Sequence, residues 1–447
     1  MKKILLGLVS LLLPTVLNAQ LPNPSTRALG MDGAYTSIAQ GYESTFWNPA
    51  MLATEGRPKF SISLPHGDLE IGSNIYNFSD FGKYANHYLS DSDKQTLLSK
   101  LEPGLPLRIH TEFGVVPFGL SIGQFAMAIG TYGEGNASIS NDAMQLLLYG
   151  NSTLSNPNQL FTANGSRGNG LVATTAAVSF ALPFSLRNNR LSFGITGKYT
   201  IGHFLASVED FGSNINTNPS FHITEAAQAI YTNYSSDCKS INPFSNSDCG
   251  GMAGRGISAD FGVTLQIPNR DITISAVLVN GLGSMTWNQN RFVYKRTKCQ
   301  IDYMSSDNFI KTCTDSTKLT TEESINADSQ ARVFRDSLLH NSNFSRLIRT
   351  GFALKKKNLT IGSTMQFRLG KGFDEQPEQL ISAGLEYNIL GFLPVRIGSS
   401  WDFNKTKTFS AGTGLKISRV NVDVSITSIS GPSYSGLRLG AGTSLIW

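Results

Sequence analysis

The strongest constraint on this chain is a repeated alternation of apolar and polar side chains with a period of two, the pattern of a β-strand with two different faces. The end of the chain shows it most clearly, because Val420, Val422, Val424 and Ile426 alternate with polar residues. The same pattern recurs upstream and downstream, at residues 191–201, 257–267, 359–369 and 437–447. The sequence therefore predicts an all-β protein.

The length of these stretches favours a membrane protein. They run for about ten residues, which is what a tilted strand needs to cross a bilayer, whereas strands of soluble proteins have about five or six residues. Charged residues make up only 15% of the chain, against about 25% in soluble domains. Because lipid offers the backbone no hydrogen-bond partners, spanning strands must close into a barrel. We therefore predict a transmembrane antiparallel β-barrel rather than a soluble all-β fold.

The connections between the predicted strands support a barrel, since outer-membrane barrels have short periplasmic turns and long external loops. If residues 58–78 and 271–287 each form one strand, there are about 14 strands, an even number. The predicted strands are 58–78, 109–116, 120–132, 171–183, 190–202, 257–267, 271–287, 346–355, 358–369, 380–390, 393–401, 407–419, 420–429 and 436–447. The short turns include 117–119, 184–189, 268–270 and 355–358, and the longest loops are 79–108, 133–170, 203–256 and 288–345.

Residues 1–19 have the features of a signal peptide. Lys2 and Lys3 precede an apolar run that ends near Leu13, and Ala19 suits a cleavage site. The run is shorter than the roughly 20 apolar residues of a membrane-spanning helix. We expect an exported protein that resides in the cell outer membrane as a multi-pass β-barrel, in contact with outer-membrane lipid.

Residues 20–56 precede the barrel, which we assign to residues 57–447, and they do not alternate. Small residues, short helical turns and prolines predict a compact plug, or hatch, inside the lumen. Two sequence segments resemble the N-terminal hatch of FadL-like outer-membrane proteins: Gly33-Ala34-Tyr35-Thr36 and Asn48-Pro49-Ala50-Met51-Leu52-Ala53. Relatives with a similar segment include PorV-type components of type IX secretion in Bacteroidota. The resemblance implies a barrel that carries fatty acids or other hydrophobic compounds.

Candidate functional residues in the hatch are Phe46, Trp47, Asn48, Pro49 and Ala50. Asn can hydrogen-bond to nearby backbone and Pro fixes the chain direction, so the segment could gate the lumen or simply seat the plug. Phe46 and Trp47 could contact a ligand or the lumen wall. Aromatic residues near strand ends, Trp287 among them, predict instead the girdle found at membrane interfaces.

A set of charged residues falls on the predicted inward faces of the strands. Lysines or arginines there could grip a carboxylate headgroup, or the charges could form a network that ties the hatch to the wall. A charge facing lipid would cost about 2–4 kcal/mol at the midplane, which is why we place all of them in the lumen. The set is Lys198, Asp260, Arg368, Glu386, Arg396, Lys416, Asp423 and Arg438.

The cysteines form two local pairs in predicted external loops, Cys238 with Cys249 and Cys299 with Cys313. In an oxidising compartment such pairs could form disulfides or remain free thiols. No His lies at ligand spacing from them, so we predict no metal site. The six dispersed His and the absence of a Gly-x-Ser-x-Gly or His-Glu-x-x-His motif predict no catalytic residues and no cofactor. The small net charge of +5 argues against nucleic acid as a partner.

Two functions follow from these features. The first is a FadL-like barrel for uptake of hydrophobic small molecules past the hatch, without hydrolysis. The second is an interaction barrel of a type IX secretion system, in which protein partners bind the external loops. A transporter needs an apolar pocket that reaches the hatch, whereas an interaction barrel needs a filled lumen and a stable outer surface.

Overall fold

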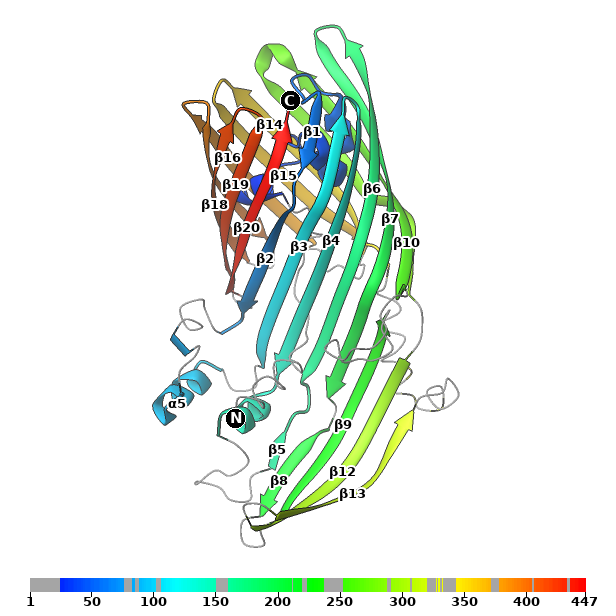
Figure 1. Ribbon diagram of the computed structural model, residues 1–447, viewed down its shortest axis with the longest axis vertical. Coiled ribbons are helices and arrows are strands. Elements are labelled where there is room, and N and C mark those ends of the chain that lie inside the picture. Colours follow the sequence, from blue (N-terminus) through cyan, green and yellow to red (C-terminus); the bar gives the residue numbers. More distant parts are fainter. Residues whose placement is uncertain are drawn as a thin grey trace.

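Long antiparallel strands form a closed wall in this computed structural model (Figure 1). The structure describes residues 25–75, 83–84, 88–101, 106–149, 160–210, 212–218, 223–236, 252–287, 291–305, 308–319, 327, 329, 332, 343–370, 378–403, 406–431 and 435–447. The predicted signal peptide, Cys238 and Cys249 lie outside these residues.

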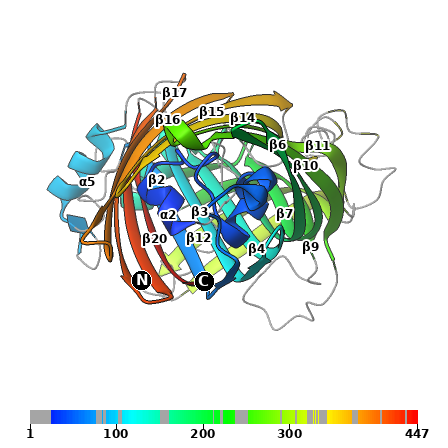
Figure 2. The same ribbon diagram turned by 90° about the horizontal axis from the view of Figure 1, so that it is seen from above.

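The wall has 14 strand positions if β1 (Phe60–Ser63) and β2 (His66–Ser73) count as one interrupted strand. Both pair antiparallel with β3 on one side and with β20 on the other, which closes the barrel. Figure 2 shows the ring from one end. The other strands are β3 (Leu107–Ile122), β4 (Phe125–Ile139), β6 (Arg167–Leu186), β7 (Asn189–Asp210), β10 (Gly254–Ile267), β11 (Ile272–Trp287), β14 (Arg346–Lys356), β15 (Leu359–Gly370), β16 (Gln379–Ile389), β17 (Leu393–Asp402), β18 (Lys407–Ile417), β19 (Val420–Ser430) and β20 (Ser435–Ile446).

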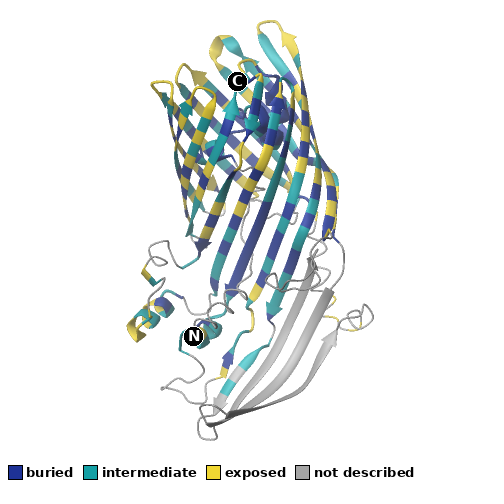
Figure 3. Ribbon diagram, viewed as in Figure 1, coloured by how far each residue is buried: buried dark blue, intermediate teal, exposed yellow. Residues whose placement is uncertain are grey.

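The polarity of the wall is the reverse of that of a soluble protein. On β19, Val422, Val424 and Ile426 are exposed on the outside, while Ser425 and Thr427 are buried on the inside. The same stripes of buried and exposed residues run along the other strands (Figure 3). An apolar exterior with a polar interior is what a barrel in lipid requires, and the alternation that predicted the fold is confirmed.

Most predicted strands are confirmed, but the turn after the second strand is wrong. Residues 117–119 lie inside β3, and the chain reverses at Gly123 and Gln124. Gly123 has a φ of +58°, which glycine adopts without strain. The pairing of β3 with β4 shifts register between Val115 and Phe118, because Pro117 cannot donate a hydrogen bond and is accommodated at a bulge. The predicted strand 120–132 is therefore divided by this turn, and its residues after Gln124 belong to β4.

Short helices before the first wall strand form the hatch. They are α2 (Thr26–Gly30), η1 (Gly41–Glu43), α3 (Ser44–Trp47) and η2 (Pro49–Ala53), and Figure 2 shows them inside the ring. Contacts run from α2 to β17–β20 and from η2 to β6, β7 and β10, so the hatch crosses the lumen. The Arg190 side chain, next to a short turn, donates to the carbonyl oxygen of Ala53 at 2.6 Å. The hatch thus occupies the end of the barrel that carries the short turns.

Additional elements lie at the opposite end of the barrel. Here β7 continues beyond β10 and pairs with β9 (Ile223–Ser236), which pairs in turn with β12 (Arg291–Ser305). The hairpin partner of β12 is β13 (Asn308–Leu319). These strands extend the wall well beyond the barrel (Figure 1). Two short strands, β5 (Leu160–Thr162) and β8 (Asn214–Asn218), and two helices, α5 (Asp91–Ser99) and α6 (Asn141–Tyr149), complete this end. No helix in the described ranges is long and apolar enough to cross a membrane.

Candidate functional site

The hatch packs directly on glycines of the wall. Gly362, Gly384 and Gly398, here called the glycine row, are successive register partners on β15, β16 and β17. A Cβ atom on Gly384 would lie 2.6 Å from the carbonyl oxygen of Met31, and one on Gly398 would overlap the same hatch residue. Because no larger side chain fits between wall and hatch here, the glycine row allows the two backbones to approach closely.

A second glycine pair receives the other end of the hatch. Gly194 and Gly262 are register partners on β7 and β10. A Cβ atom on Gly194 would overlap the backbone of Pro49 and Ala50, and one on Gly262 would overlap the Asn48 side chain. The segment Asn48-Pro49-Ala50 is therefore fitted to the wall at backbone distance.

The Asn48 side chain forms three hydrogen bonds from a fully buried position. Its Nδ2 donates to Thr264 Oγ1 on β10 at 3.0 Å and to the Thr36 carbonyl oxygen at 3.4 Å. Its Oδ1 accepts from the Ala50 amide at 3.1 Å, which caps η2. Pro49 begins η2, where its missing N–H removes no helical hydrogen bond. The bond to Thr264 holds the hatch against β10 and must break if this segment leaves the wall, whereas the other two bonds shape the hatch itself.

The side chains of Phe46 and Trp47 pack against different strands of the wall. Trp47 is buried, with its ring centroid 5.4 Å from that of Tyr35 in an edge-to-face arrangement. The Arg349 guanidinium from β14 lies 5.3 Å from the Trp47 centroid, within the range of a cation–π contact. The Phe46 ring lies against Gly130 on β4. Both aromatic side chains therefore belong to the contact between hatch and wall.

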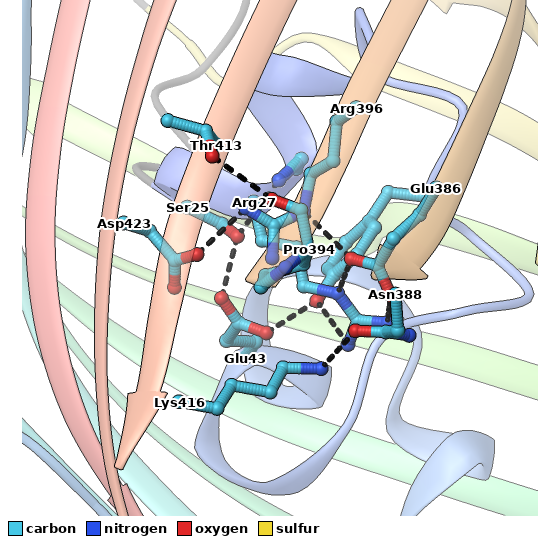
Figure 4. Close-up of polar contacts among 12 residues, drawn as sticks. Ser25, Arg27, Glu43, Glu386, Asn388, Pro394, Arg396, Thr413, Lys416 and Asp423 are labelled. Atoms are coloured by element: carbon cyan, nitrogen blue, oxygen red, sulfur yellow. Dashed lines mark hydrogen bonds and ion pairs between the residues drawn. The ribbon is translucent and has the colours of Figure 1, made fainter. Parts of the chain in front are cut away.

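Several predicted inward charges meet one hatch arginine in the Arg27 cluster, formed by Arg27, Glu386, Arg396 and Asp423 (Figure 4). Arg27 Nε lies 2.8 Å from Glu386 Oε2, and Arg396 Nε lies 2.6 Å from the same oxygen. Arg396 also reaches Asp423 Oδ1 at 2.6 Å. Glu386 and Arg396 are each 1% exposed, so these charges are stabilised by one another rather than by water. The cluster ties the hatch to three wall strands.

Glu43 continues this polar network within the hatch (Figure 4). Its carboxylate accepts hydrogen bonds from Ser25 Oγ and from the Tyr35 hydroxyl, both at 2.5 Å. Burial raises the pKa of the Tyr35 hydroxyl well above its ordinary value, and the neighbouring Glu43 raises it further. Tyr35 therefore stays protonated and remains a hydrogen-bond donor.

A cavity of about 490 Å³ lies between the hatch and the wall at the short-turn end. Arg27 and Glu43 line it from the hatch, and the wall adds strand ends and turns. The wall side chains are almost all polar, and the charged ones are Lys355, Glu386, Arg396, Lys416 and Asp423. Lys416 Nζ donates to Asn388 Oδ1 at 2.8 Å. The cavity is chemically suited to hold ions or polar groups, not hydrocarbon.

The remaining predicted charges lie elsewhere in the wall. Lys198 Nζ is 2.6 Å from Asp260 Oδ2, and Asp260 also accepts from the Asn280 amide at 2.8 Å. Arg368 pairs with Glu378 at 3.0 Å, and the Glu378 side chain is 71% exposed. These residues are too scattered to form one headgroup site with the Arg27 cluster.

Arg438 is the centre of a further group of buried charges. Its guanidinium reaches Asp68 at 2.5 Å, Glu112 at 3.0 Å and Glu70 at 3.4 Å. Glu70 and Glu112 are direct register partners on β2 and β3. Like charges at such a position repel each other, and the single guanidinium between them compensates for this.

An outer apolar cluster occupies the lumen on the long-loop side of the hatch. Trp287 is only 5% exposed and packs on Gly202 and Gly254, which are register partners. Its position corrects the prediction that Trp287 belongs to the interface girdle, because two facing glycines create an inward space for the indole. Trp401, in contrast, is 44% exposed and stacks on Phe403. The members of the cluster are Tyr132, Leu171, Ala173, Leu205, Ala253, Met285, Trp287 and Phe344.

The two cysteines within the described residues lie opposite each other. Cys299 on β12 and Cys313 on β13 are direct register partners in an antiparallel pair. Opposite residues in such a pair have Cα atoms about 4.5–5.5 Å apart, within the range of about 4.4–6.8 Å found across disulfides. The backbone arrangement is therefore compatible with a bond between them.

The sequence matches the model of a protein family described as "Family of unknown function (DUF5723)" over residues 49–426. The chain belongs to this family. The matched segment begins at Pro49 in the hatch and ends in β19. A comparison with curated protein sequences finds no match. For this DUF5723 protein, function must therefore be inferred from the barrel and its contents.

Solved structures with a similar fold are outer-membrane channels. The deltaS2 mutant of the TodX monoaromatic hydrocarbon channel aligns with a TM-score of 0.50 and 10% identity, over 95% of this chain and 99% of that one. The Pseudomonas putida toluene transporter TodX has a TM-score of 0.48 and 12% identity, over 94% and 97%. A Pseudomonas aeruginosa FadL homologue has 0.45 and 11%, over 96% and 100%. The predicted resemblance to FadL-like barrels is confirmed for the fold, through its similarity to that of TodX.

The sequence pattern did not identify the residues that the hatch itself contributes to the charged site. Arg27 and Glu43 lie in a segment without periodicity, so nothing indicated which way their side chains face. Lys355 was assigned to a turn, although it ends up lining the cavity. The glycine row offered a usable signal, because glycines recur at inward positions of neighbouring strands, where they weaken a sheet unless another backbone approaches.

Proposed function

We propose that this protein is an outer-membrane channel for uptake of hydrophobic small molecules, with the hatch as its gate. The observation that carries the proposal is the position of the hatch, which crosses the lumen of a closed barrel with an apolar exterior. TodX, whose fold this chain shares, is described as a monoaromatic hydrocarbon channel. A molecule entering from the long-loop side would meet the outer apolar cluster before it reaches the hatch.

If the hatch is the gate, its contacts with the wall are the interactions that must break when it opens. Its end at Asn48 is held by a hydrogen bond to Thr264 on β10, and its beginning is held by the ion pair between Arg27 and Glu386. The glycine contacts between these two ends are close but involve no charge. We propose that residues Phe46–Ala50 move as the gate, because this end can leave the wall without separating a buried ion pair.

Uptake by intact cells tests this function. Cells that express the protein in their outer membrane should take up radiolabelled toluene or decanoate faster than cells that carry an empty vector. Cells expressing an unrelated barrel of similar size are the control for a general loss of membrane integrity. Equal uptake in all three strains, with the protein present in the outer membrane, would contradict a channel for hydrophobic compounds.

One observation favours a second candidate, an interaction barrel such as those of type IX secretion. The strands β9, β12 and β13 project beyond the barrel rim, where the pairing of β9 with β12 and of β12 with β13 forms a sheet that partners outside the barrel can reach (Figure 1). In this reading the hatch is a permanent plug. Isolation of the protein from its native membrane would then yield a stoichiometric protein partner, which is lost when residues 291–319 are deleted.

A further inference from the structure

The short-turn end of the barrel, at the top of Figure 1, has a rim that is rich in exposed basic side chains. Within the described part of the chain, the exposed side-chain carboxylates of this rim are Glu55 and Asp271. Glu55 lies 3.8 Å from another cation, Arg190. Six further cations are exposed, form no ion pair with described residues and are here called the basic rim: Lys59, Arg187, Arg270, Lys356, Lys357 and Arg419. Their positive charge is therefore available to a partner outside the barrel.

The basic rim follows the circumference of the barrel. Its members lie immediately before β1 and in the hairpins that join β6 to β7, β10 to β11, β14 to β15 and β18 to β19. In the closed ring these hairpins are spread around the wall and not gathered on one side. A soluble protein that docks on one side would contact only some of the cations, whereas the lipid around a barrel contacts all of them. The distribution therefore favours membrane lipid as the anionic partner.

The cations stand at the ends of the apolar stripes on the outer surface. On β14 the outward positions include Phe352 and Leu354, and Lys356 occupies the next one. On β6 the outward Leu186 is 53% exposed, and Arg187 follows it at the tip of the turn. Long basic side chains lay their apolar stems along such a surface while the charged head reaches the polar interface. The basic rim therefore lies where the lipid-facing surface ends, at the depth of the headgroups.

Two members of the basic rim occupy backbone positions that smaller residues adopt more easily. Arg187 has a φ of +55° and Lys357 a φ of +52°, both in the left-handed region. Tight hairpin turns favour Gly, Asn or Asp at positions of positive φ, because a Cβ atom is strained there. A long cationic side chain at each of these turns is not explained by turn geometry, so its charge is the better explanation.

Arg419 lies beside an aromatic residue on the outer surface. Its guanidinium is 5.4 Å from the ring centroid of Trp447, which is 40% exposed. Lys59 belongs to the same part of the rim, because its amide donates to the Trp447 carbonyl oxygen at 2.9 Å. Tryptophan is typical of membrane interfaces, and a guanidinium has five N–H donors. Arg419 can therefore bind a phosphate oxygen while it remains over the ring.

We propose that the basic rim binds the phosphate groups of anionic phospholipids in the membrane leaflet at the short-turn end. In outer-membrane barrels this is the periplasmic leaflet. A basic residue close to a membrane surface attracts anionic lipid with a preference of about fivefold. The bound headgroups hold the end of the barrel that contains the hatch at a fixed depth in the membrane. The proposal concerns the outer surface and does not depend on transport through the lumen.

Quenching of Trp447 fluorescence by brominated lipids tests this proposal. The full-length protein carries Trp401→Phe, which removes the other exposed tryptophan, and is placed in phosphatidylcholine vesicles. The vesicles contain a small equal fraction of either brominated phosphatidylglycerol or brominated phosphatidylcholine, and the additional change Trp447→Phe gives the background from buried tryptophans. We expect an enrichment of phosphatidylglycerol at Trp447 of about fivefold, which decreases as salt screens the contact.

Two pairs of substitutions separate direct contact from total charge. Lys59→Gln with Arg419→Gln should abolish the preference, and Lys59→Arg with Arg419→Lys should keep it. The matched control, Lys356→Gln with Lys357→Gln, removes the same charge from a hairpin about 19 Å away along the sheet, at about 4.8 Å per strand. This exceeds the Debye length of about 8 Å, so the preference at Trp447 should remain. Circular dichroism and resistance to SDS at room temperature confirm that each variant is folded.

Three results would overturn the proposal. The first is equal quenching by the two brominated lipids when the basic rim is intact. The second is a preference for phosphatidylglycerol that survives the loss of Lys59 and Arg419, and the third is one that the distant control pair abolishes to the same extent. If equal quenching is accompanied by capture of an acidic soluble protein that requires the rim, the partner is a protein and not lipid.

Discussion

The two sides of the hatch differ in how the lumen is filled. On the short-turn side, the wall approaches the hatch through glycines and buried ion pairs, and the remaining space is the polar cavity. On the long-loop side, large apolar side chains such as Trp287 and Phe344 fill the lumen. Buried charges also lie on the long-loop side, because the Arg438 group and the Lys198–Asp260 pair lie beyond Gly440 and Gly262, the glycines that contact the hatch. The two sides therefore differ in the large apolar side chains of the long-loop side, not in the presence of charge. Variants on each side of the hatch can show whether that side depends on these contacts.

The largest effect is expected at the glycine row. Gly398→Val places a Cβ atom 2.3 Å from a backbone atom of Met31, and overpacking against backbone cannot be relieved while the hatch stays in place. The hatch should leave its seat, so that a protease added to detergent-solubilised protein cuts within residues 25–56. Gly197→Val is the control, because a Cβ atom at Gly197 meets nothing within 4 Å. Equal protease resistance of the two variants would mean that the glycine row does not hold the hatch.

The Arg27 cluster should give the next largest effect. Arg396→Gln leaves Glu386 and Asp423 with too little compensation, and breaking a buried ion pair costs about 3–5 kcal/mol. We expect the free energy of unfolding in urea, measured in detergent or lipid, to fall by that amount. Arg368→Gln should change it by no more than about 1 kcal/mol, because the partner of Arg368 is exposed. Similar losses in both variants would show that burial of the cluster contributes nothing.

A smaller effect is expected at Asn48. Asn48→Ala removes the cap of η2 and the hydrogen bond to Thr264, which together contribute about 1–2 kcal/mol. Amide hydrogen exchange should become faster in residues 49–53 and remain unchanged in α2, since α2 is held separately by Arg27. Faster exchange throughout the hatch would instead mean that the hatch moves as one unit.

The smallest effect concerns the extension on the long-loop side. From the register of β12 and β13 we predict a disulfide between Cys299 and Cys313, which closes a short loop and adds local stability only. Mass spectrometry of unreduced peptides should recover the linked pair, and Cys299→Ser should leave Cys313 open to alkylation. Alkylation of both cysteines in the native protein without reductant would contradict the bond.

The sequence predicts the wall of this protein much better than its contents. Alternation over residues 420–426 follows directly from the contrast between lipid and lumen, so it identifies strands and their inward faces. Periodicity locates turns less reliably: we predict a turn at residues 117–119, but the chain turns at Gly123. Proline and glycine occur at bulges as well as at turns, so they do not distinguish the two. The prediction for Trp287 is wrong for a related reason, since its slot is formed by Gly202 and Gly254, which become neighbours only through the pairing of β7 with β10.

The candidate site could be predicted only in part. Glu386, Arg396 and Asp423 were identified as inward charges from periodicity alone, and all belong to the Arg27 cluster. Their arginine partner from the hatch could not be identified, because a segment of short turns has no period that orients its side chains. Which charges meet depends on strand register and on how the hatch lies, and neither is contained in a local pattern.

The most direct test of the central claim is to lock the hatch to the wall. Asn48 Nδ2 in the proposed gate lies 3.0 Å from Thr264 Oγ1 on β10, so the pair Asn48→Cys and Thr264→Cys should form a disulfide. The control pair Thr175→Cys and Thr200→Cys joins the neighbouring wall strands β6 and β7 at an oxygen–oxygen distance of 2.9 Å and involves no hatch residue. If the hatch is the gate, oxidation of the first pair alone abolishes uptake of labelled decanoate and toluene by intact cells, and reduction restores it. Undiminished uptake with the first disulfide formed would contradict a moving hatch.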